Sequence, residues 1–421
     1  MNIQPANIYI QEYSYSLPAD RIADHPLAQR DESKLLIFRD GDLEEDRFKN
    51  AARHVPADAT LILNNTKVIE ARLFFQKATG GVIEIFCLEP DGPYQNIAQT
   101  MAQTEKTQWQ CLIGGASKWK PGQLLHKEIV LEGTPVQLTA RYVEKRADCF
   151  AIEFFWAPSH YAFAEVLHAA GAIPLPPYIK RAAEVEDADR YQTIFARHEG
   201  SVAAPTAALH FTEQVMETLK DKGVLPQYIT LHVGAGTFKP VKSETIADHA
   251  MHAEHFSVSK ATLRALQQPR PIVAVGTTSL RTLESLYWIG IKLLHNPELS
   301  PQELVLQQWE AYELESKGIS YADSLQAILN YIEGQGADEV FCQTSLLIVP
   351  GYTFHSASAL FTNFHQPQST LLLLVAAFIG EKWRKVYDHA LAHDYRFLSY
   401  GDSSLLFRAD LPPIPSNEEN P

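Results

Sequence analysis

Two hydrophobic patterns divide this chain of 421 residues. Between about residues 71 and 156, apolar and polar positions alternate in short stretches such as VIEIF and VQLTARY, which Gly-Gly and Pro-Gly pairs separate. Alternation with a period of two is typical of half-buried strands, and glycine and proline mark the turns between them. The pattern predicts a small antiparallel β-barrel domain over residues 71–156, inserted into a larger domain.

The rest of the chain alternates continuous apolar runs with helical patterns. The runs end in glycine, asparagine or threonine, as buried parallel strands do: TLILNN at 60–65, YITLHVGAG at 228–236, PIVAVGTT at 271–278 and SLLIVPGY at 345–352. Helical spacing lies between them, as in TEQVMETLKDKG at 212–223 and SLRTLESLYWIGIKLL at 279–294. Residues 1–70 and 157–410 are therefore predicted to form one α/β domain with a barrel-like mixed sheet. Its ligands should lie beyond the carboxyl ends of the strands.

Two segments of the larger domain differ from this pattern. Residues 296–340 carry helix-start signals at Ser300 and Ser320, and they predict a helical extension whose apolar face packs on the domain. Residues 411–421 are rich in proline and polar residues, and they predict a disordered tail.

Composition narrows the class of protein. A net charge of −14 disfavours broad adhesion to nucleic acid or membrane, although one local basic patch could still hold a phosphate backbone. The first residues carry no signal-peptide pattern, and the longest apolar run, at 371–380, is about half of what a bilayer requires. The four cysteines lie far apart without a C-x-x-C pair. We therefore expect a cytoplasmic protein with no membrane segment and no metal.

The stretch TLHVGAGTFKPV at 230–241 resembles a strand that enters a glycine-rich nucleotide loop. It departs from the loop of methyltransferases, because His232 stands where those enzymes place an acidic residue and Phe238 stands where a small residue admits the cofactor. The G-x-x-x-x-G-K-[ST] spacing of a Walker loop is absent as well. A tight turn after a strand explains the glycines equally well.

Polar residues also gather in GAIPLPPYIKR at 171–181. Three prolines stiffen the backbone before Tyr178, Lys180 and Arg181, which together suit an anionic or nucleobase-bearing ligand. A rigid connector between domains is the alternative.

Histidines and carboxylates recur near the ends of predicted elements. In DHAMHAEHF at 248–256, His252 and Glu254 would share a face only in a strand, so acid–base or hydrogen-bonding use is favoured over a metal site. Asn363 and His365 precede a buried helix, where an anion could bind, although elaborate capping would use the same residues. Asp402 lies in YRFLSYGDSSLLF, and no G-x-S-x-G elbow of a serine hydrolase occurs.

Taken together and in order, these stretches resemble the S-adenosylmethionine:tRNA ribosyltransferase-isomerase family of queuosine biosynthesis. The resemblance spans nearly all of residues 8–407 and rests on ILNNTKVIEARL, IPLPPYIKR, YQTIF, GSVAAPTAALHF, TLHVGAGTFKPV, HAMHAEHF, AVGTTSLRTLES, VPGYTF, ALFTNFHQPQSTLLLLVAAF and YRFLSYGDSSLLF. It implies an α/β domain interrupted by a small β-barrel, with the active site near their junction.

The resemblance also implies the reaction. The ribosyl part of S-adenosylmethionine moves onto the aminomethyl group of 7-aminomethyl-7-deazaguanine at the tRNA wobble position and is isomerised. The products are epoxyqueuosine in tRNA, adenine and methionine. S-adenosylmethionine is a co-substrate, no prosthetic group is needed, and the partner is the anticodon loop of tRNAs of the GUN type. A monomer is favoured.

This chemistry requires several proton transfers and a site that holds the whole ribose. Histidines suit such transfers, so the candidate acid–base set is His210, His232, His252 and His365, with Glu254 and Asp402 as groups that orient them. The candidate S-adenosylmethionine site consists of Gly234, Gly236, Thr237, Thr277, Thr278, Ser279 and Arg281, the hydroxyls meeting ribose and the guanidinium meeting the methionine carboxylate. The candidate residues for the modified base and tRNA phosphates are Tyr178, Lys180, Arg181 and Asn363.

Several positions depart from the family pattern. Ala208 replaces a glycine beside His210, Lys67 and Glu70 replace arginine and proline, and residues 86–111 and 296–340 are extended. Two alternatives therefore stand beside the main hypothesis. One is a diverged paralogue that acts on another nucleoside substrate, and the other is a tRNA-binding protein without catalysis.

Overall fold

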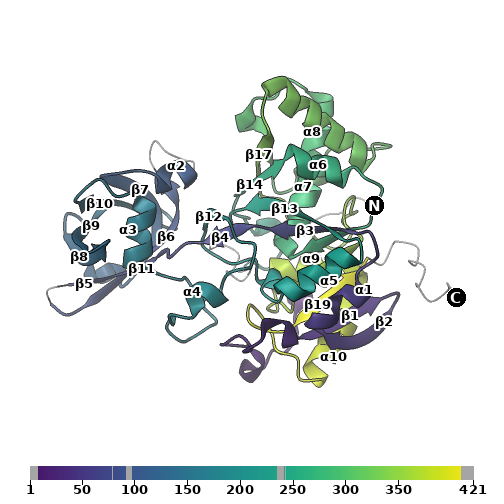
Figure 1. The fold of residues 1–421 in the computed structure, drawn as a ribbon, viewed down its shortest axis with the longest axis horizontal. Helices are drawn as coiled ribbons and strands as arrows, with labels where there is room; N and C mark the ends of the chain where they lie inside the picture. Colours follow the sequence, from purple (N-terminus) through teal and green to yellow (C-terminus); the bar gives the residue numbers. More distant parts are fainter. Residues whose placement is uncertain (1–7, 78, 92–96, 235–240, 242, 409–421) are drawn as a thin grey trace.

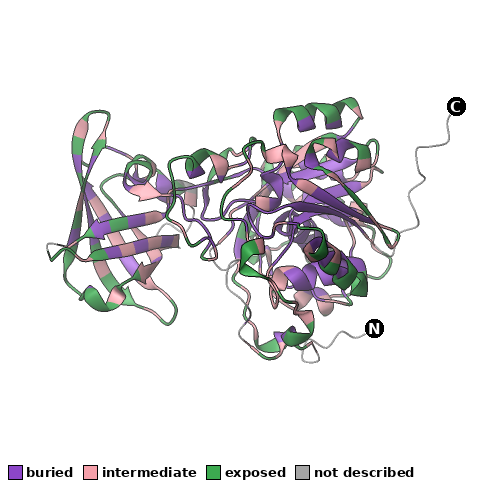
Figure 2. Cartoon of the chain, turned by 90° about the horizontal axis from the view of Figure 1, so that it is seen from below, coloured by how far each residue is buried: buried purple, intermediate pink, exposed green. Residues whose placement is uncertain are grey.

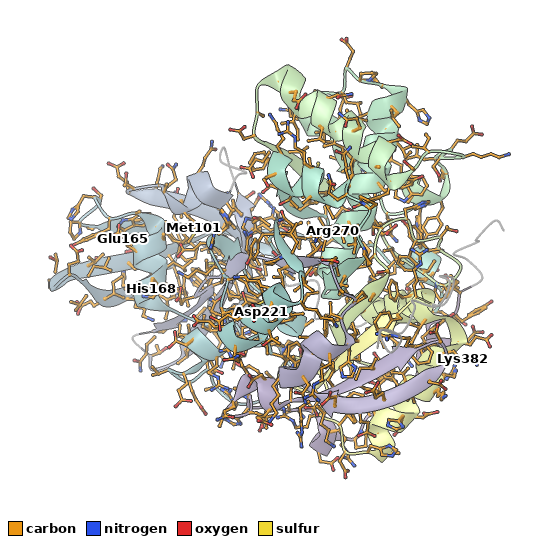
Figure 3. The ribbon with its side chains drawn as sticks, turned by 45° about the vertical axis from the view of Figure 1, so that its right-hand side comes forward. Met101, Glu165, His168, Asp221, Arg270 and Lys382 are labelled. Atoms are coloured by element: carbon orange, nitrogen blue, oxygen red, sulfur yellow. The ribbon has the colours of Figure 1, made fainter. Side chains whose placement is uncertain are left out.

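The structure, a computed structural model, describes residues 8–77, 79–91, 97–234, 241 and 243–408. They form two bodies, a large one around a ten-stranded mixed sheet and a smaller one around a curled seven-stranded antiparallel sheet (Figure 1). Met101 and His168 lie in the smaller body, and Lys382 lies at the opposite end of the molecule (Figure 3). The predicted fold class, an α/β protein with an additional antiparallel β-sheet body, is confirmed.

The large sheet has a parallel centre. In spatial order its strands are β16 (Val305–Leu306), β17 (Glu339–Thr344), β14 (Glu254–Ser259), β13 (Leu225–Leu231), β3 (Thr60–Asn64), β15 (Ile272–Val275), β18 (Ala359–Asn363), β19 (Ser403–Phe407), β1 (Lys34–Arg39) and β2 (Asp42–Arg47). Strands β13, β3, β15 and β18 run parallel to their neighbours, whereas β14 and β19 pair antiparallel on either side of them. The carboxyl ends of the four central strands therefore meet at one edge.

Helices cover both faces of this sheet, which explains the continuous apolar runs. Along β3, Ile62 packs on one face with α7 (Thr277–His295) and α9 (Thr370–Ile379), whereas Leu61 and Leu63 pack on the other face with α1 (Ala51–His54) and α5 (Glu213–Asp221). Strands β3, β15 and β18 are buried along their whole length, and the sheet centre is correspondingly buried in Figure 2. The predicted strands at 60–65 and 271–278 and both predicted helices are confirmed.

The predicted strand over 345–352 is wrong. Strand β17 ends at Thr344, and the chain continues outside any sheet as an extended segment. The N–H of Ser345 donates to the carbonyl of Leu306 (2.9 Å). The next four apolar residues alternate between two core clusters, so both sides of the segment are buried without strand neighbours. The place beside β15 belongs to β18 instead.

The segment predicted as a helical extension, 296–340, contains one long helix. Helix α8 (Tyr321–Gln335) begins at Ser320, whose hydroxyl accepts the N–H of Asp323 (3.1 Å), and ends at Gly336 in the left-handed region with φ of +64°. It packs beside α6 (Lys260–Leu266) and against α7. The segment therefore thickens the helical layer on one face of the sheet (Figure 1).

The smaller sheet is entirely antiparallel. Its order is β11 (Gly171–Ala172), β5 (Arg72–Gln76), β6 (Val82–Asp91), β7 (Lys106–Gly114), β10 (Phe150–Ala157), β9 (Thr134–Lys145) and β8 (Leu124–Leu131). Alternate residues enter one core with α2 (Ile97–Met101) and α3 (Phe163–Ala170), and the sheet curls until β8 lies near β5. The domain boundaries predicted at residues 71 and 156 stay a prediction, and the predicted tail at 411–421 lies outside the described residues.

A short parallel pair, β4 (Thr66–Val68) and β12 (His198–Ser201), lies between the two bodies together with α4 (Asp187–Arg190) (Figure 1). Helix α10 (Trp383–Ala392) closes the far side of the large body. Among the described helices, none has both the length and the apolar character that spanning a bilayer requires.

Candidate active site

A pocket of about 760 Å³ lies beyond the carboxyl ends of the central strands. Val233 follows β13, Gly276 follows β15, and Asn363 is the last residue of β18. The other lining residues are Tyr178, Ala203, Ala204, Pro205, Thr206, Ala207, Thr277, Thr278, Thr362, His365, Gln366, Ser369, Leu371, Leu398 and Ser399. This is the edge at which the sequence predicted ligand binding.

Two helices begin at this pocket. Gly276 has a φ of +91°, which favours glycine, and its N–H donates to the carbonyl of Phe361 (2.8 Å), so the chain turns sharply from β15 into α7. Helix α9 begins beside it at Ser369, whose hydroxyl accepts the N–H of Leu372 (3.2 Å). Helix amino termini carry partial positive charge, so this wall suits an anionic group such as a carboxylate.

Asn363 supplies a directed hydrogen-bond donor. Its side-chain oxygen accepts the hydroxyl of Thr206 (2.9 Å), and the residue is 3% exposed. Within the part of the chain that the structure describes, Nδ2 has no hydrogen-bond partner. A buried amide without a partner costs free energy, and a ligand acceptor in the pocket would recover that cost.

His365 is the only predicted acid–base histidine among the residues that line this pocket. The imidazole Nε2 of His365 lies 2.8 Å from the hydroxyl of Thr362. Its backbone N–H donates to the hydroxyl of Tyr387, and its backbone carbonyl accepts the hydroxyl of Tyr15. Burial lowers the pKa of His365 to about 3. The imidazole is therefore neutral at physiological pH and can accept or donate hydrogen bonds.

His210 lines a different, smaller pocket of about 290 Å³, which shares Ser399 with the larger one. Burial lowers the pKa of His210 to about 4, and Nδ1 lies 3.3 Å from the carbonyl of Arg30. The sequence placed His210 with His365, and the structure places the two on neighbouring pockets.

His232 and His252 line neither pocket. His232 lies half-buried at the end of β13 with Nδ1 3.0 Å from the hydroxyl of Thr66, and burial lowers its pKa to about 4. His252 is exposed and interacts electrostatically with Glu89 of the smaller sheet. Both histidines therefore lie toward the junction of the two bodies.

The predicted S-adenosylmethionine residues are only partly together. Thr277 and Thr278 line the larger pocket, and Ser279 is fully buried with a hydroxyl that has no partner among the described residues. Arg281 forms a buried ion pair with Glu254, which also accepts the N–H of Gly234 (3.4 Å). Burial lowers the pKa of Arg281 to about 10. The guanidinium is thus linked through Glu254 to Gly234, and Gly236 and Thr237 lie outside the described residues.

Two other predicted residues already have partners within the protein. Arg181 forms a bidentate ion pair with Asp187 (2.6 and 2.8 Å). Asp402 accepts the backbone N–H groups of Lys34 (2.9 Å) and Arg396 (2.7 Å) and so ties the start of β1 to the chain before β19. These contacts are structural, and whether either side chain also meets a substrate stays a prediction.

The remaining two predicted tRNA residues differ in placement. Tyr178 lines the larger pocket with its hydroxyl 2.5 Å from that of Ser399, whereas Lys180 is exposed outside it.

Sequence reasoning missed Thr206 and Ser399 as lining residues. Both lie inside stretches that were singled out, GSVAAPTAALHF and YRFLSYGDSSLLF, where a hydroxyl among small residues is a weak signal. Arg30 and Arg190, which line the smaller pocket, lie 160 positions apart in unremarked segments, so only folding brings them together.

One group of potential metal ligands occurs among the described residues. Ligand atoms of Glu45, His389 and His393 lie within 4.8 Å of one another on β2 and the end of α10. None of the three lines either pocket. The prediction that the chain uses no metal stays a prediction.

Fold and pocket together define a class, an α/β protein with a pocket at the carboxyl edge of a mixed sheet. A family model described as queuosine biosynthesis protein matches residues 10–406. The chain therefore belongs to the queuosine biosynthesis protein family.

Individual relatives agree with this assignment. A relative from Azoarcus sp. named S-adenosylmethionine:tRNA ribosyltransferase-isomerase is 37% identical over 407 residues, covering 95% of this chain and 98% of the relative. A relative of the same name from Pelobacter propionicus is 36% identical over 404 residues, covering 94% and 99%. The crystal structure of an S-adenosylmethionine tRNA ribosyltransferase from Thermotoga maritima has a TM-score of 0.44 and 27% identity over 94% of this chain and 100% of that chain.

The family confirms the predicted class of enzyme, a transferase and isomerase of queuosine biosynthesis, with S-adenosylmethionine as a substrate and tRNA as the other. It supports the main hypothesis over the diverged paralogue and the non-catalytic binding protein.

Proposed function

We propose that this chain transfers and isomerises the ribosyl group of S-adenosylmethionine onto 7-aminomethyl-7-deazaguanine at the wobble position of GUN-type tRNAs. The products are epoxyqueuosine in tRNA, adenine and methionine. One observation carries the proposal beyond family membership. The pocket at the carboxyl edge combines two helix amino termini, a wall of small residues and the directed amide of Asn363.

The pocket can hold S-adenosylmethionine by its two polar ends. The amino terminus of α7, with Thr277 and Thr278, takes the methionine carboxylate through backbone N–H groups. This role falls to the helix because the guanidinium of Arg281 is already paired with Glu254. Asn363 and Thr206 take the ribose or adenine by hydrogen bonds. Small side chains at Ala203, Ala204 and Ala207 leave room for the whole sugar.

The sulfonium acidifies the neighbouring C–H of the ribose, so a base must remove that proton, and adenine must gain one as it leaves. A base works best when its pKa lies near the working pH. Burial depresses the pKa values of His365, His210 and His232, so each is a weak base in the free protein. We assign His365 to hydrogen bonding with the leaving base. An anionic substrate beside a histidine would raise its pKa and restore it as a proton acceptor.

The smaller body helps to hold the tRNA. His252 of the large body interacts electrostatically with Glu89 of the smaller sheet, and the pair β4 and β12 lies between the two bodies (Figure 1). We assign residues 71–156 to a domain that contacts tRNA from one side of this junction, and we expect the enzyme to act as a monomer.

Mass spectrometry tests the reaction directly. Purified protein is incubated with S-adenosylmethionine and a GUN anticodon stem-loop that carries 7-aminomethyl-7-deazaguanine. We expect adenine release and the added mass of epoxyqueuosine. Stem-loops with unmodified guanine or with a non-GUN anticodon serve as controls for the acceptor and should stay unchanged. No adenine, or adenine without RNA modification, contradicts the proposal.

A pair of variants tests the pocket. Thr278→Val removes one hydroxyl at the start of α7 and keeps the side-chain shape, so the KM for S-adenosylmethionine should rise about 2- to 10-fold, the loss of one hydrogen bond. Thr218→Val removes an exposed hydroxyl on α5 and is the matched control, with unchanged KM. Equal KM values for both variants would place the ligand elsewhere.

A further inference from the structure

The smaller pocket, next to the active-site pocket, has a composition of its own. Four chain segments meet there: residues 26–33 before β1, the end of α4, the turn after the short helix at Thr206–Ala208, and the segment before β19. Its lining residues are Pro26, Leu27, Arg30, Ser33, Arg190, Leu209, His210, Arg396, Ser399 and Tyr400. Its volume of about 290 Å³ includes space open to solvent, so the pocket is a recess at the surface and not a closed cavity.

The lining is strongly basic. It includes three arginines and no carboxylate. Arg30 donates to the carbonyl of Gln192 (3.0 Å), and Arg190 donates to the carbonyl of Leu27, so neither has an ion pair within the described residues. Carbonyl oxygens orient a guanidinium without cancelling its charge. Arg396 has a carboxylate nearby, Asp402 at 3.7 Å, and the carboxylates of Asp31 and Asp189 act on Arg30 from outside the lining.

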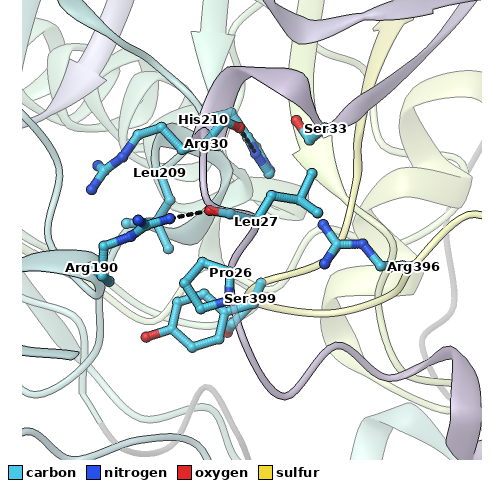
Figure 4. Close-up of a pocket in the computed structure, with 10 residues that line it drawn as sticks. Pro26, Leu27, Arg30, Ser33, Arg190, Leu209, His210, Arg396 and Ser399 are labelled. Carbon is cyan, nitrogen blue, oxygen red and sulfur yellow. Dashed lines mark hydrogen bonds between the residues drawn. The ribbon is translucent and has the colours of Figure 1, made fainter. Parts of the chain in front are cut away.

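Figure 4 shows how these groups lie. Arg190 and Arg396 stand on opposite sides of Leu27 in this view, with Ser33 and His210 beyond it. The side chains of Arg30 and Arg190 lie on the same side of Leu27 (Figure 4), and their charges act on each other. Two guanidinium groups from separate segments can bind a phosphate, each through a pair of N–H groups.

Two buried polar groups of the pocket have no partner among the described residues. The hydroxyl of Ser33, which is 1% exposed, and Nε2 of His210, which is 5% exposed, both lack a hydrogen bond. Nδ1 of His210 lies against the carbonyl of Arg30, and a carbonyl only accepts, so Nδ1 carries the proton and Nε2 of the neutral ring is an acceptor. The pocket therefore offers donors to an anion and one acceptor to a hydroxyl.

That combination matches the RNA backbone. A phosphodiester is an anion without a proton to give, and the 2′-hydroxyl of the adjoining ribose is a donor that DNA lacks. Ser399 lines both pockets, so a strand held in the smaller one has its next base beside the larger one. The chain is acidic as a whole, so a confined basic pocket would position one backbone unit rather than attract RNA broadly.

We propose that the smaller pocket binds one phosphodiester of the tRNA strand together with the 2′-hydroxyl of the adjoining ribose, and so holds the strand while the modified base enters the active-site pocket. This inference rests on the proposed function, because it takes tRNA as the substrate. Arg30 and Arg190 bind the phosphate oxygens, and Nε2 of His210 accepts the 2′-hydroxyl. His210 is then a substrate-positioning residue of the RNA backbone.

The test combines changes on both partners. Anticodon stem-loops carry a single uncharged methylphosphonate linkage, or a single 2′-deoxy ribose, at each position around the wobble base, and their binding to the wild-type protein is measured at several salt concentrations. We expect one linkage whose neutralisation weakens binding about 10-fold or more, and one adjoining 2′-deoxy position that weakens it less. A scan in which no single linkage matters overturns the inference, and this arm needs no protein variant.

Variants then connect that linkage to the pocket. Arg190→Gln should weaken binding of the unmodified stem-loop, lower the slope of log affinity against log salt by about 0.7, and lose its sensitivity to the critical linkage. Arg264→Gln, which changes an exposed arginine on α6, is the matched control and should leave all three unchanged. Wild-type sensitivity to the linkage in Arg190→Gln contradicts the assignment.

Two further arms separate the outcomes. Inorganic phosphate shares the anion chemistry, so a thermal shift with phosphate in wild type but not in Arg190→Gln, without any critical linkage, assigns the pocket to a free anion and overturns the RNA part. Adenine release is measured in the same preparations. Turnover without a critical linkage refutes only this inference, whereas a critical linkage without turnover refutes only the proposed reaction.

Discussion

Replacing Asn363 by leucine gives the sharpest measure of what the active-site pocket binds. The side chain is buried, its oxygen accepts the hydroxyl of Thr206 at 2.9 Å, and Nδ2 has no partner in the described part of the chain. An unmet buried donor costs about 1–3 kcal/mol, which a bound ligand that accepts the hydrogen bond restores. Leucine has a similar size and removes the donor. Binding of S-adenosylmethionine should therefore weaken by about 5- to 150-fold.

The assay is calorimetric titration of S-adenosylmethionine into Asn363→Leu and wild type, without tRNA, with thermal unfolding of both to confirm that the variant is folded. Asn330→Leu, an exposed asparagine on α8, is the matched control and should bind as wild type does. Unchanged affinity in Asn363→Leu would refute the reasoning, because the free amide would then face no part of the ligand.

Three further predictions concern stability. Glu284→Gln should lower the free energy of unfolding by about 1–3 kcal/mol with catalysis intact, because the buried carboxylate accepts hydrogen bonds from Tyr352 and from the loop at 355–356, and the amide nitrogen of glutamine leaves at least one of these donors unmet. Glu254→Gln should cost about 3–5 kcal/mol by leaving Arg281 charged and buried, whereas the double variant with Arg281→Met should recover most of it. Lowering the pH from 7.5 to 5 should lower the free energy of unfolding by about 2 kcal/mol for each of His210 and His365. Their folded pKa values of about 4 and about 3 lie below the unfolded value near 6.5. The contribution of each neutral histidine to stability is therefore fully present above pH 6.5 and is lost as the pH falls below it.

Chemical denaturation measures all three. Glu298→Gln, at an exposed carboxylate, is the control for the first two and should change the free energy of unfolding by less than about 0.5 kcal/mol. A thermal midpoint of Glu284→Gln equal to that of wild type would mean that the carboxylate is protonated in the fold. Asparagine at both buried histidines should flatten the pH dependence between 7.5 and 5, and an unchanged dependence would assign it to other groups.

The sequence predicted those parts of the fold that a local pattern specifies. Period-two alternation located the smaller sheet, and helical spacing located α5 and α7. The error at 345–352 has a physical cause, since a segment buried on both sides has the hydrophobic pattern of a central strand whether or not strands lie beside it. The hydrophobic pattern of one segment does not show whether other strands form hydrogen bonds with it.

The sequence predicted that the active site lies at the carboxyl edge of the sheet, but it did not predict which side chains contact one another there. Thr277 and Thr278 were expected there because the carboxyl ends of parallel strands meet, and Asn363 was expected to bind substrate because it precedes a buried helix. Arg281 of α7 was expected to face the ligand, but the structure pairs it with Glu254, a partner 27 positions away on strand β14. Ion pairs of this kind depend on side-chain directions that only the packed fold sets.

By itself the sequence determined the strands β3 and β15, the helices α5 and α7 and the family, and it supplied a set of candidate residues for the chemistry. Only the tertiary structure decided which of those residues share a pocket, because hydrogen bonds such as that between Thr206 and Asn363 join positions 157 residues apart. The same holds for the second, basic pocket, whose arginines come from segments with no common pattern. Local periodicity records how a segment is buried, whereas a site depends on distances that arise only when the whole sheet and its helices pack together.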